Sequence, residues 1–432
     1  MDPRVEPSVY LTADVPPVGG VLRERPEDFF VEELPLYEPS GRGEHLYLFV
    51  EKRNLTTTQA IAAIARHFRV PHGAVGYAGL KDKRAVTRQL FSVHLPGKSE
   101  ADFPAFEHDR MAILWMDRHE NKLRRGHLAG NRFVIRIRGV DATKVVHAHR
   151  VLRTLERTGV PNRAGEQRFG YLGRNHEIGR ALLLGEHRTA LDLLLGPCEA
   201  APEWQAEARR LYAERKYEAA REAFPPTERT ERRALAALAK GDGPKRAIDT
   251  MDELQRRYYI TAFQSAIFNA LLDDRLAAGA LGSLEEGDLA WKHDSGAVFP
   301  VTADELASGS LPPRLAALEI SPSGPMWGAD MTRASGPVGE RELAALTAVG
   351  VTPGDLVAYG ERTGDCVAVQ GARRPMRVPL KYPDAEGGVD ERGHYIRCVF
   401  ELPRGAFATV VMREIMKPEL AGSPPLDVGD ED

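Results

Sequence analysis

Hydrophobic residues in the first hundred positions recur with two different periods. Residues 45–53 (HLYLFVEKR) are rich in aromatic and β-branched side chains, which is typical of a strand. Thr56 and Gln59 have the spacing of a capping box, and apolar residues then recur at helical spacing, so a helix is predicted over 57–69. The segment 88–95 is again predicted to be a strand. A strand, a helix, a turn and a strand in this order are typical of a mixed α/β layer.

A later segment, 132–138 (RFVIRIR), alternates strictly and therefore predicts a strand with two unlike faces. One face has Phe133, Ile135 and Ile137, and the other has Arg132, Val134, Arg136 and Arg138. Helical spacing follows over 142–158, the chain from about 178 to 278 is helical in character, and 287–376 is predicted to be richer in strands. The middle of the chain thus differs in pattern from the α/β segments before it.

At 432 residues the chain is expected to form two or three domains. It has no apolar run long enough to span a membrane, and its N-terminal sequence lacks the basic and apolar parts of a signal peptide. We therefore expect a soluble, cytoplasmic protein that does not enter a membrane. The three cysteines, Cys198, Cys366 and Cys398, are far apart, and neither a C-x-x-C pair nor an H-E-x-x-H motif occurs, so neither a disulfide framework nor a zinc site is expected.

The formal net charge of −4 is unevenly distributed along the chain. Residues 418–432 contain five acids and no base among several Pro and Gly residues, and are predicted to be a disordered acidic tail. Without this tail the chain is close to neutral. Residues 121–138, by contrast, contain no acid and six bases: Lys122, Arg124, Arg125, Arg132, Arg136 and Arg138. Such a basic stripe favours binding of nucleic-acid phosphates, although a charged run is also typical of a solvated face.

The stretch 76–93 (GYAGLKDKRAVTRQLFSV) carries the candidate chemistry. Its single carboxylate, Asp82, follows a Gly-x-x-Gly turn and is surrounded in the sequence by Lys81, Lys83, Arg84 and Arg88. Nearby cations favour the ionised carboxylate and are expected to lower its pKa. An ionised carboxylate on an exposed turn can act as a nucleophile or as a base. The alternative interpretation is a solvated, charged hairpin loop.

Within this stretch, residues 79–89 (GLKDKRAVTRQ) resemble the central signature of the TruD family of tRNA pseudouridine synthases. In that family the Asp of the Lys-Asp pair is the essential catalytic residue, which implies that Asp82 is catalytic. The same resemblance implies that Lys81, Thr87 and Gln89 support the active site. Whether Asp82 attacks the sugar, attacks the ring or removes a ribose proton stays open at this stage.

Further segments resemble other elements of the family, in the family's order. They are 25–29 (RPEDF), 130–133 (GNRF), 162–170 (NRAGEQRFG), 263–269 (FQSAIFN), 322–328 (PSGPMWG) and 399–409 (VFELPRGAFAT). The first implies that Arg25 lies near the active site, whereas an ion pair with Glu27 or Asp28 is the alternative. The second implies that Asn131 helps to hold the active-site loop and that Phe133 stacks on the target base. The apolar face that contains Phe133 favours a plain core position instead.

The segment 162–170 departs from the family pattern, because Arg163 and Ala164 occupy the positions of an aromatic pair. Its Gly-rich turn with an arginine favours contact with the RNA backbone, and a purely structural turn is the alternative. Besides the basic stripe, the residues expected to contact RNA are Gln167, Arg168, Arg373 and Arg374.

The resemblance extends over about residues 25–414 and implies an α/β fold of mixed α+β type. It implies a pseudouridine synthase catalytic domain with a mixed antiparallel sheet, interrupted by an inserted TruD-specific domain. The implied boundaries are 1–160 and 377–417 for the catalytic domain, 161–376 for the insertion and 418–432 for the tail. The implied reaction is isomerisation of uridine 13 of tRNA without a cofactor or a metal. The expected partner is tRNA, and no protein partner is implied.

Two alternative functions stay open. The first is the same chemistry on another RNA, which the departure at residues 163 and 164 allows. The second is a non-catalytic RNA-binding or RNA-folding protein of the same fold. An Asp-based hydrolase unrelated to RNA is disfavoured, because the motifs present supply no metal ligands, catalytic triad or phosphate loop.

Overall fold

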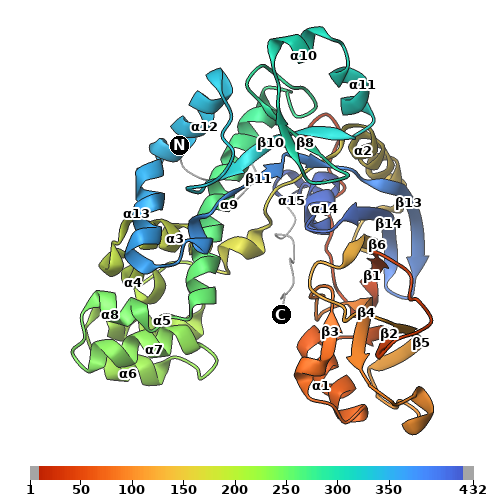
Figure 1. The fold of residues 1–432 in the computed structure, drawn as a ribbon, viewed down its shortest axis with the longest axis horizontal. Helices are drawn as coiled ribbons and strands as arrows, with labels where there is room; N and C mark the ends of the chain where they lie inside the picture. Colours follow the sequence, from red (N-terminus) through yellow and green to blue (C-terminus); the bar gives the residue numbers. More distant parts are fainter. Residues whose placement is uncertain (1–8, 422–432) are drawn as a thin grey trace. The chain divides into compact units, whose positions relative to one another are not determined.

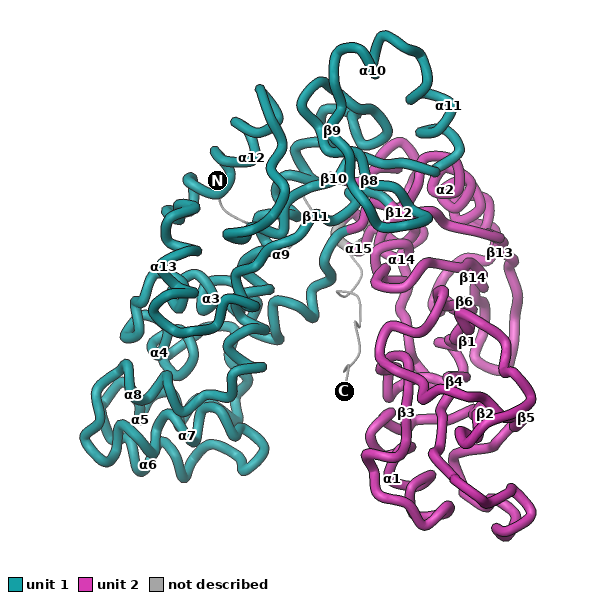
Figure 2. The backbone as a smooth tube through the Cα atoms, viewed as in Figure 1, with its two compact units in different colours: residues 1–9, 163–377 teal, residues 10–162, 378–432 magenta. Residues whose placement is uncertain are grey.

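The computed structural model describes residues 9–421 and divides the chain into two compact units (Figure 2). Unit 1 comprises residues 1–9 and 163–377, and unit 2 comprises residues 10–162 and 378–432. The chain therefore leaves unit 2 after residue 162 and returns to it at residue 378. Two short strands, β7 (Val160–Pro161) and β12 (Arg377–Val378), lie at these two crossings.

An eight-stranded sheet forms the centre of unit 2, in the order β13-β14-β6-β1-β4-β2-β5, and β3 also pairs with β4. β1 and β4 run parallel, whereas the other neighbouring strands are antiparallel. The strands are β1 (Phe29–Pro35), β2 (His45–Arg53), β3 (Val75–Tyr77), β4 (Val86–His94), β5 (Met111–His119), β6 (Leu128–Arg138), β13 (Lys381–Asp390) and β14 (Gly393–Pro403). This mixed sheet agrees with the mixed α/β pattern of the sequence.

One face of the sheet is buried beneath helices (Figure 1). Core side chains of β1, β6 and β14 pack against α2 (Val145–Thr158) and α14 (Ala408–Met416). Towards the other edge, side chains of β2 and β4 pack against α1 (Thr57–His67). Between these two apolar clusters the buried face is polar, with Glu33, Lys52 and Gln89 each no more than 1% exposed.

Local sequence signals predict the start of α1 correctly. Oγ1 of Thr56 accepts a hydrogen bond from the amide of Gln59 at 3.0 Å, and Oε1 of Gln59 accepts one from the amide of Thr56 at 3.0 Å. Both halves of the predicted capping box are therefore present. The helix ends at His67, two residues before its predicted end. The predicted strand over 45–53 is confirmed as β2.

Unit 1 combines a group of helices with a four-stranded sheet in the order β11-β10-β8-β9. The longest helix, α9 (Glu253–Ala277), contacts both α3 and β10 and so connects the helical part to the sheet. The other helices are α3 (Asn175–Leu184), α4 (His187–Leu195), α5 (Glu203–Ala213), α6 (Tyr217–Ala223), α7 (Arg229–Ala239), α8 (Pro244–Asp249), α10 (Ala303–Ala307), α11 (Leu311–Ala316), α12 (Gly336–Ala348) and α13 (Pro353–Thr363). The strands are β8 (Leu289–Lys292), β9 (Val298–Pro300), β10 (Ile320–Met326) and β11 (Ala372–Pro375).

The described chain ends with α15 (Pro418–Ala421), which occupies the first positions of the predicted acidic tail; residues 422–432 lie outside the described residues. Across residues 9–421, no single helix has the length and apolar character needed to cross a membrane. α12 and α13 meet that requirement only when taken together, and they are bent by 59° at their junction. The same part of the chain holds no group of three or more His, Cys, Asp or Glu side chains that could bind a metal ion.

Candidate active site

Asp82 lies on the loop 78–85, which connects β3 to β4 and is anchored to the polar part of the buried face. Its side chain is 17% exposed, so the carboxylate is within reach of a ligand. Oδ2 of Asp82 lies 3.2 Å from Nη2 of Arg23, whose own side chain is only 1% exposed. A buried guanidinium at this distance favours the ionised form of the carboxylate.

Arg23 is held in place although it belongs to no helix or strand. Its guanidinium lies 4.0 Å from the ring centre of Phe29, and its backbone has a left-handed φ of 58°. Its buried Nε and Nη1 atoms have no hydrogen-bond partner within residues 9–421. A positive φ at a non-glycine residue and unsatisfied buried donors both cost stability and are typical of functional sites. No local pattern in the sequence distinguishes Arg23 from Arg25, two positions later, so Arg23 is not predicted from the sequence.

Lys52 contacts the backbone of the Asp82 loop from β2. Its Nζ atom donates hydrogen bonds to the carbonyl oxygens of Leu55 at 2.5 Å, Lys81 at 3.4 Å and Asp82 at 3.2 Å. The side chain is 1% exposed, and burying an ammonium group is costly unless it is hydrogen-bonded. The sequence did contain a signal for this residue, because alternation along β2 places Lys52 on the same face as Leu48 and Val50.

Two further side chains hold the same loop. Oγ1 of Thr57, the first residue of α1, accepts a hydrogen bond from the amide of Lys81 at 3.0 Å. Nε2 of Gln89, on β4, donates a hydrogen bond to the carbonyl oxygen of Gly79 at 3.2 Å. The loop backbone is thus fixed from α1, β2 and β4, which positions Asp82 against Arg23.

Lys81 forms a buried ion pair with Glu33 of β1. Nζ of Lys81 lies 2.8 Å from Oε2 of Glu33, and the two side chains are 6% and 1% exposed. Oε1 of Glu33 also accepts a hydrogen bond from the amide of Leu90 at 3.3 Å. The charge of Lys81 is therefore neutralised by Glu33 and not by the adjacent Asp82.

The basic surroundings of Asp82 differ from those expected from the sequence. Besides Lys81, Arg88 is also directed elsewhere, because it lies 2.8 Å from Glu51 and 3.2 Å from Glu32. Alternation along β4 places Arg88 on the sheet face opposite to Gln89, so residues adjacent in the sequence separate onto two faces. A cation that pairs with Asp82 is Arg23, which comes from a distant segment.

Asn131 and Thr87, both predicted to support the site, lie on the same buried face as Gln89. In the sheet register Asn131 is opposite Glu33, and Thr87 is opposite both Val31 and Lys52. Oδ1 of Asn131 and Oγ1 of Thr87 are buried and have no hydrogen-bond partner in the part of the chain that the structure describes. Of the predicted residues, Lys81 belongs to the loop and Gln89 contacts it, whereas Thr87 and Asn131 share the sheet face to which the loop is anchored.

Phe133 occupies a core position next to this site. Its side chain is 6% exposed, and its ring centre lies 5.5 Å from that of Phe400 on the neighbouring strand. It shares a hydrophobic cluster with Val31 and with Ala85, the last residue of the Asp82 loop. This is the core role that the alternation of residues 132–138 favours, whereas the family resemblance implies a role in stacking on the target base.

Arg25 and Arg138 belong to an ion-pair network on the other face of the sheet. Arg25 lies 2.9 Å from Asp390 and 3.3 Å from Asp28, which is the alternative that the sequence left open for it. Arg138 pairs with Asp28 at 2.7 Å and with Asp390 at 2.8 Å, and its side chain is 1% exposed. Hydrogen bonds from Arg138 hold the pKa of Asp390 well below its usual range. Placing Arg138 on an exposed phosphate-binding face was therefore wrong, since two carboxylates already neutralise it.

The first half of the basic stripe lies beside the strand that leads into the Asp82 loop. The amide of Gly126 donates a hydrogen bond to the carbonyl oxygen of Ala78 at 2.8 Å. A Cβ atom on Gly76 would lie 2.3 Å from the carbonyl oxygen of Leu123, so this close approach of two backbones requires glycine. The exposed or partly exposed bases carried here are Lys122, Arg124 and Arg125.

The second half of the stripe faces elsewhere. Arg132 is opposite Glu32 and Glu401 in the register, and Arg136 lies 5.0 Å from the ring centre of Tyr395. Alternation along β6 places both arginines on the sheet face opposite to Asn131 and Phe133. The sequence suggested one continuous surface of six bases. The structure does not contain such a surface, because Arg132, Arg136 and Arg138 lie on the face of β6 opposite to the one that holds Asp82.

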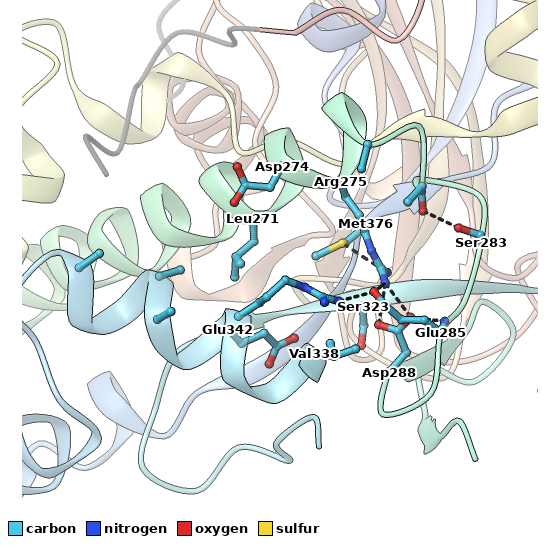
Figure 3. A pocket seen from close by; sticks show the side chains of 16 residues that line it. Leu271, Asp274, Arg275, Ser283, Glu285, Asp288, Ser323, Val338, Glu342 and Met376 are labelled. Atoms are coloured by element: carbon cyan, nitrogen blue, oxygen red, sulfur yellow. Dashed lines mark hydrogen bonds and ion pairs between the residues drawn. The ribbon is translucent and has the colours of Figure 1, made fainter. Parts of the chain in front are cut away.

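Arg373, in unit 1, was predicted to contact RNA, but its side chain is buried. It is 7% exposed and forms ion-pair contacts with Glu342 at 2.7 and 2.8 Å. Its Nε also donates a hydrogen bond to Oγ of Ser323 at 3.1 Å; Glu342 and Ser323 line a pocket next to α12 (Figure 3). Arg373 thus has an internal structural role, since its charge is already neutralised.

Arg168 and Arg374 are both partly exposed in unit 1. The guanidinium of Arg168 lies 5.0 Å from the ring centre of Tyr258, and that of Arg374 lies 5.5 Å from the ring centre of Phe268. Burial, together with the positive charge of Arg168, lowers the pKa of Arg374 to about 10.

A family model described as tRNA pseudouridine synthase D (TruD) matches residues 5–415 of the chain. The chain belongs to the TruD family. The tRNA pseudouridine synthase D of Geobacter metallireducens is 43% identical over 410 residues, covering 94% of this chain and 97% of that protein. The corresponding protein of Geobacter sulfurreducens is 43% identical over 412 residues, covering 95% and 97%. A crystal structure of a TruD protein from Methanosarcina mazei has a TM-score of 0.81 at 26% identity and covers 96% of this chain and 97% of that one.

As a member of the TruD family, the chain is a tRNA pseudouridine synthase, which is an isomerase. Its mixed α/β fold is that of the TruD protein of known structure. These findings confirm the family, the fold class and the class of enzyme that the motifs predicted.

The two positions that depart from the TruD pattern have defined contacts in unit 1. Arg163 is 6% exposed and forms an ion pair with Asp273 of α9. The amide and the carbonyl oxygen of Ala164 are both bound by the side chain of Asn269, at 2.9 and 3.1 Å. This segment is thus attached to α9 by polar contacts where the family pattern has an aromatic pair.

Proposed function

We propose that this TruD protein converts uridine 13 of tRNA to pseudouridine, with Asp82 as the catalytic residue. The observation that carries the proposal is the Asp82–Arg23 pair on a loop whose backbone is bound by Lys52, Thr57 and Gln89. Position 13 follows from the family resemblance. In this proposal unit 2 is the catalytic domain, unit 1 is the TruD-specific insertion, and the enzyme acts in the cytoplasm.

The reaction moves the uracil ring from an N-glycosidic to a C-glycosidic bond. The bond between the ribose C1′ and N1 breaks, a bond between C1′ and C5 forms, and the proton on C5 is lost while N1 gains one. The conversion is redox-neutral. An ionised carboxylate can serve as the nucleophile that holds the sugar or the ring, or as the base that removes a proton. Arg23 keeps Asp82 in the ionised form that either role requires.

The target base must leave its stack before it reaches Asp82, which costs roughly a few kcal/mol. Lys122, Arg124 and Arg125 lie beside the segment that leads into the Asp82 loop, where they would bind the phosphates around the extruded nucleotide. Arg168 and Arg374 are the proposed phosphate contacts of unit 1, with Gln167 beside them. Asn131, Thr87 and Phe133 are proposed to support the loop from the sheet.

The proposal is tested by mapping pseudouridine through chemical labelling in tRNA that lacks the modification. The tRNA is incubated with the native protein and, separately, with Asp82→Asn, which keeps the size of the side chain and removes its charge. We expect modification at position 13 with the native protein and none with the variant, while both proteins bind the tRNA.

Other outcomes would select among the alternatives. Modification at another position or in another RNA would replace the proposed target and retain the chemistry. Unchanged turnover by Asp82→Asn would reject Asp82 as the catalytic residue. Binding without modification of any RNA would favour a non-catalytic RNA-binding protein.

A further inference from the structure

Two cavities of unit 1 differ in whether their charged side chains are paired within the protein. In the larger one, of about 690 Å³, Arg275 pairs with Asp288 at 2.6 Å (Figure 3). Glu342, which also lines this cavity, pairs with Arg373 at 2.7 Å. The buried charges around that cavity are therefore neutralised within the protein. The smaller cavity, of about 250 Å³, lies between the turn 170–174 and the first turns of α7 and α9.

Tyr171 contributes an exposed aromatic ring to the smaller cavity. It is 62% exposed and stands on a turn between Gly170 and Gly173, whose φ angles of 76° and 67° are left-handed. Its hydroxyl accepts a hydrogen bond from Nε2 of Gln205 at 2.5 Å, so the ring is oriented although it is exposed. A fixed, exposed aromatic ring is suited to stacking on an unpaired base.

Glu231 supplies a carboxylate to the same cavity. Burial, reinforced by nearby Glu228, raises the pKa of Glu231, so water only partly solvates its charge. Arg209 is close enough for its charge to act on Glu231, but it donates its hydrogen bonds to Gln205 and to the carbonyl oxygens of Leu194 and Gly196. Within the described residues Glu231 forms no ion pair, so its carboxylate can accept a hydrogen bond from a ligand.

The surroundings of this cavity favour RNA as its ligand. Tyr258 also lines the cavity. The guanidinium of Arg168 lies 5.0 Å from the ring centre of Tyr258. Arg174 lines the cavity as well. Arg174 also pairs with Glu177 at 3.2 Å. An arginine beside an aromatic ring is typical of sites that bind single-stranded nucleic acid through stacking and phosphate contacts. The volume of about 250 Å³ is below the roughly 300–1,000 Å³ of small-molecule sites and suits one ring system.

We propose that this cavity binds one unstacked nucleobase of the tRNA, a base with an exocyclic amino group, stacked on Tyr171 and hydrogen-bonded to Glu231. The inference rests on the proposed function, because it takes tRNA as the ligand. Guanine, cytosine and adenine have exocyclic amino groups that donate to a carboxylate, whereas uracil has carbonyl oxygens at these positions and donates only from its ring N3–H. An amino group as donor therefore distinguishes the other three bases from uracil. The cavity lies in unit 1, whereas Asp82 lies in unit 2.

The test is a binding experiment that pairs one change in the protein with one change in the RNA. Unmodified tRNA transcripts, each with one unpaired nucleotide made abasic, are titrated at one salt concentration against Asp82→Asn, which leaves the RNA unmodified. The series is repeated with Tyr171→Ala added and, as a matched control, with Tyr171→Phe added. Tyr171→Phe keeps the ring and removes only the hydroxyl.

We expect one abasic position to weaken binding about tenfold for the parent and for Tyr171→Phe, because the stacked base is missing. With Tyr171→Ala, that transcript should bind as well as the complete transcript does. Removing only the amino group of the same base should weaken binding severalfold for the parent and should have no effect with Glu231→Ala.

If every abasic position has the same effect with and without Tyr171→Ala, the cavity is not a base site and the inference fails. It also fails if Tyr171→Ala weakens the binding of all transcripts equally. Turnover by the native chain is measured separately, so that the two proposals can fail separately. If the native chain modifies tRNA but Tyr171→Ala does not abolish the effect of any abasic position, only the cavity inference is rejected. If Tyr171→Ala abolishes the effect of one abasic position but the native chain modifies no tRNA, only the proposed function is rejected.

Discussion

At the scale of residues, the candidate site depends on charges that meet from distant parts of the sequence. Asp82 pairs with Arg23 across 59 positions, and Lys81 pairs with Glu33 across 48. Glu33 neutralises Lys81, whereas Asp82 pairs with Arg23, whose two other buried nitrogens have no partner among residues 9–421. Arg23 is therefore a buried cation in direct contact with Asp82.

Replacing Arg23 should lower activity more than RNA binding. With Arg23→Met we expect kcat/KM to fall about 10- to 100-fold, because a hydrogen bond between charged groups contributes roughly 1.5–3 kcal/mol. Arg23→Lys keeps the positive charge and should recover part of the loss. The measurement is the single-turnover rate of pseudouridine formation, with tRNA affinity determined in parallel. Native rates for Arg23→Met would show that Asp82 acts without this cation.

At the scale of elements, strand alternation determines which side chains reach the site. Glu33 from β1, Lys52 from β2, Gln89 from β4 and Asn131 from β6 lie on one face, whereas Arg88, Arg132 and Arg138 lie on the other. Lys52 and Gln89, of the first group, donate hydrogen bonds to backbone carbonyl oxygens of the Asp82 loop. The arginines of β6 thus lie on the face opposite to the one that holds the Asp82 loop.

In unit 1, the connection between β8 and β10 contains a histidine that is neutral in the folded state. Nε2 of His293 lies 2.8 Å from Oγ of Ser321, and burial, with the charge of Arg377, lowers the pKa of His293 from 6.5 to about 4. The unfolded chain binds a proton near pH 6.5, whereas the folded chain does so only near pH 4. Stability from this group is therefore present above pH 6.5 and is lost as the pH falls towards 4.

We expect the melting temperature to fall between pH 6.5 and 4, and to fall less in His293→Gln, which can still bind Ser321. Calorimetry or circular dichroism at several pH values measures this difference. Other buried histidines affect the melting temperature of the native protein and of the variant equally, so their effect cancels in the comparison. Parallel pH curves for the native protein and the variant would contradict the prediction.

At the scale of the whole molecule, the net charge of −4 is a poor guide to RNA binding. What matters is that Lys122, Arg124 and Arg125 gather beside the Asp82 loop, whereas Arg138 and Arg373 are neutralised within the fold. Phosphate contacts release counterions, so tRNA affinity is expected to fall steeply as the salt concentration rises.

The double variant Arg124→Ala/Arg125→Ala should weaken tRNA binding and reduce the slope of log affinity against log salt by about two. Arg132→Ala is the matched control, because it removes an exposed base on the opposite sheet face. It should change the slope little. An equal reduction in the control would place the RNA on the other face of the sheet.

Much of the fold and part of the site were predictable from the sequence. The capping box of α1 and the strand β2 follow from contacts between near neighbours, and the catalytic signature contains Asp82, Lys81, Thr87 and Gln89 in one segment. Arg23 and Glu33 were not predicted because each is an ordinary charged residue in the sequence, and Lys52 was not predicted although alternation along β2 places it on the buried face. Their importance comes from burial and from partners far along the chain.

The family, the mixed α/β class and the segment that carries the candidate chemistry can all be read from the sequence, because they depend on local patterns and on motifs within short stretches. The contact between Arg23 and Asp82, the exposure of each base and the internal positions of Arg138 and Arg373 become visible only in the folded chain. An ion pair requires closeness in space, and strand pairing brings together residues that no local periodicity relates.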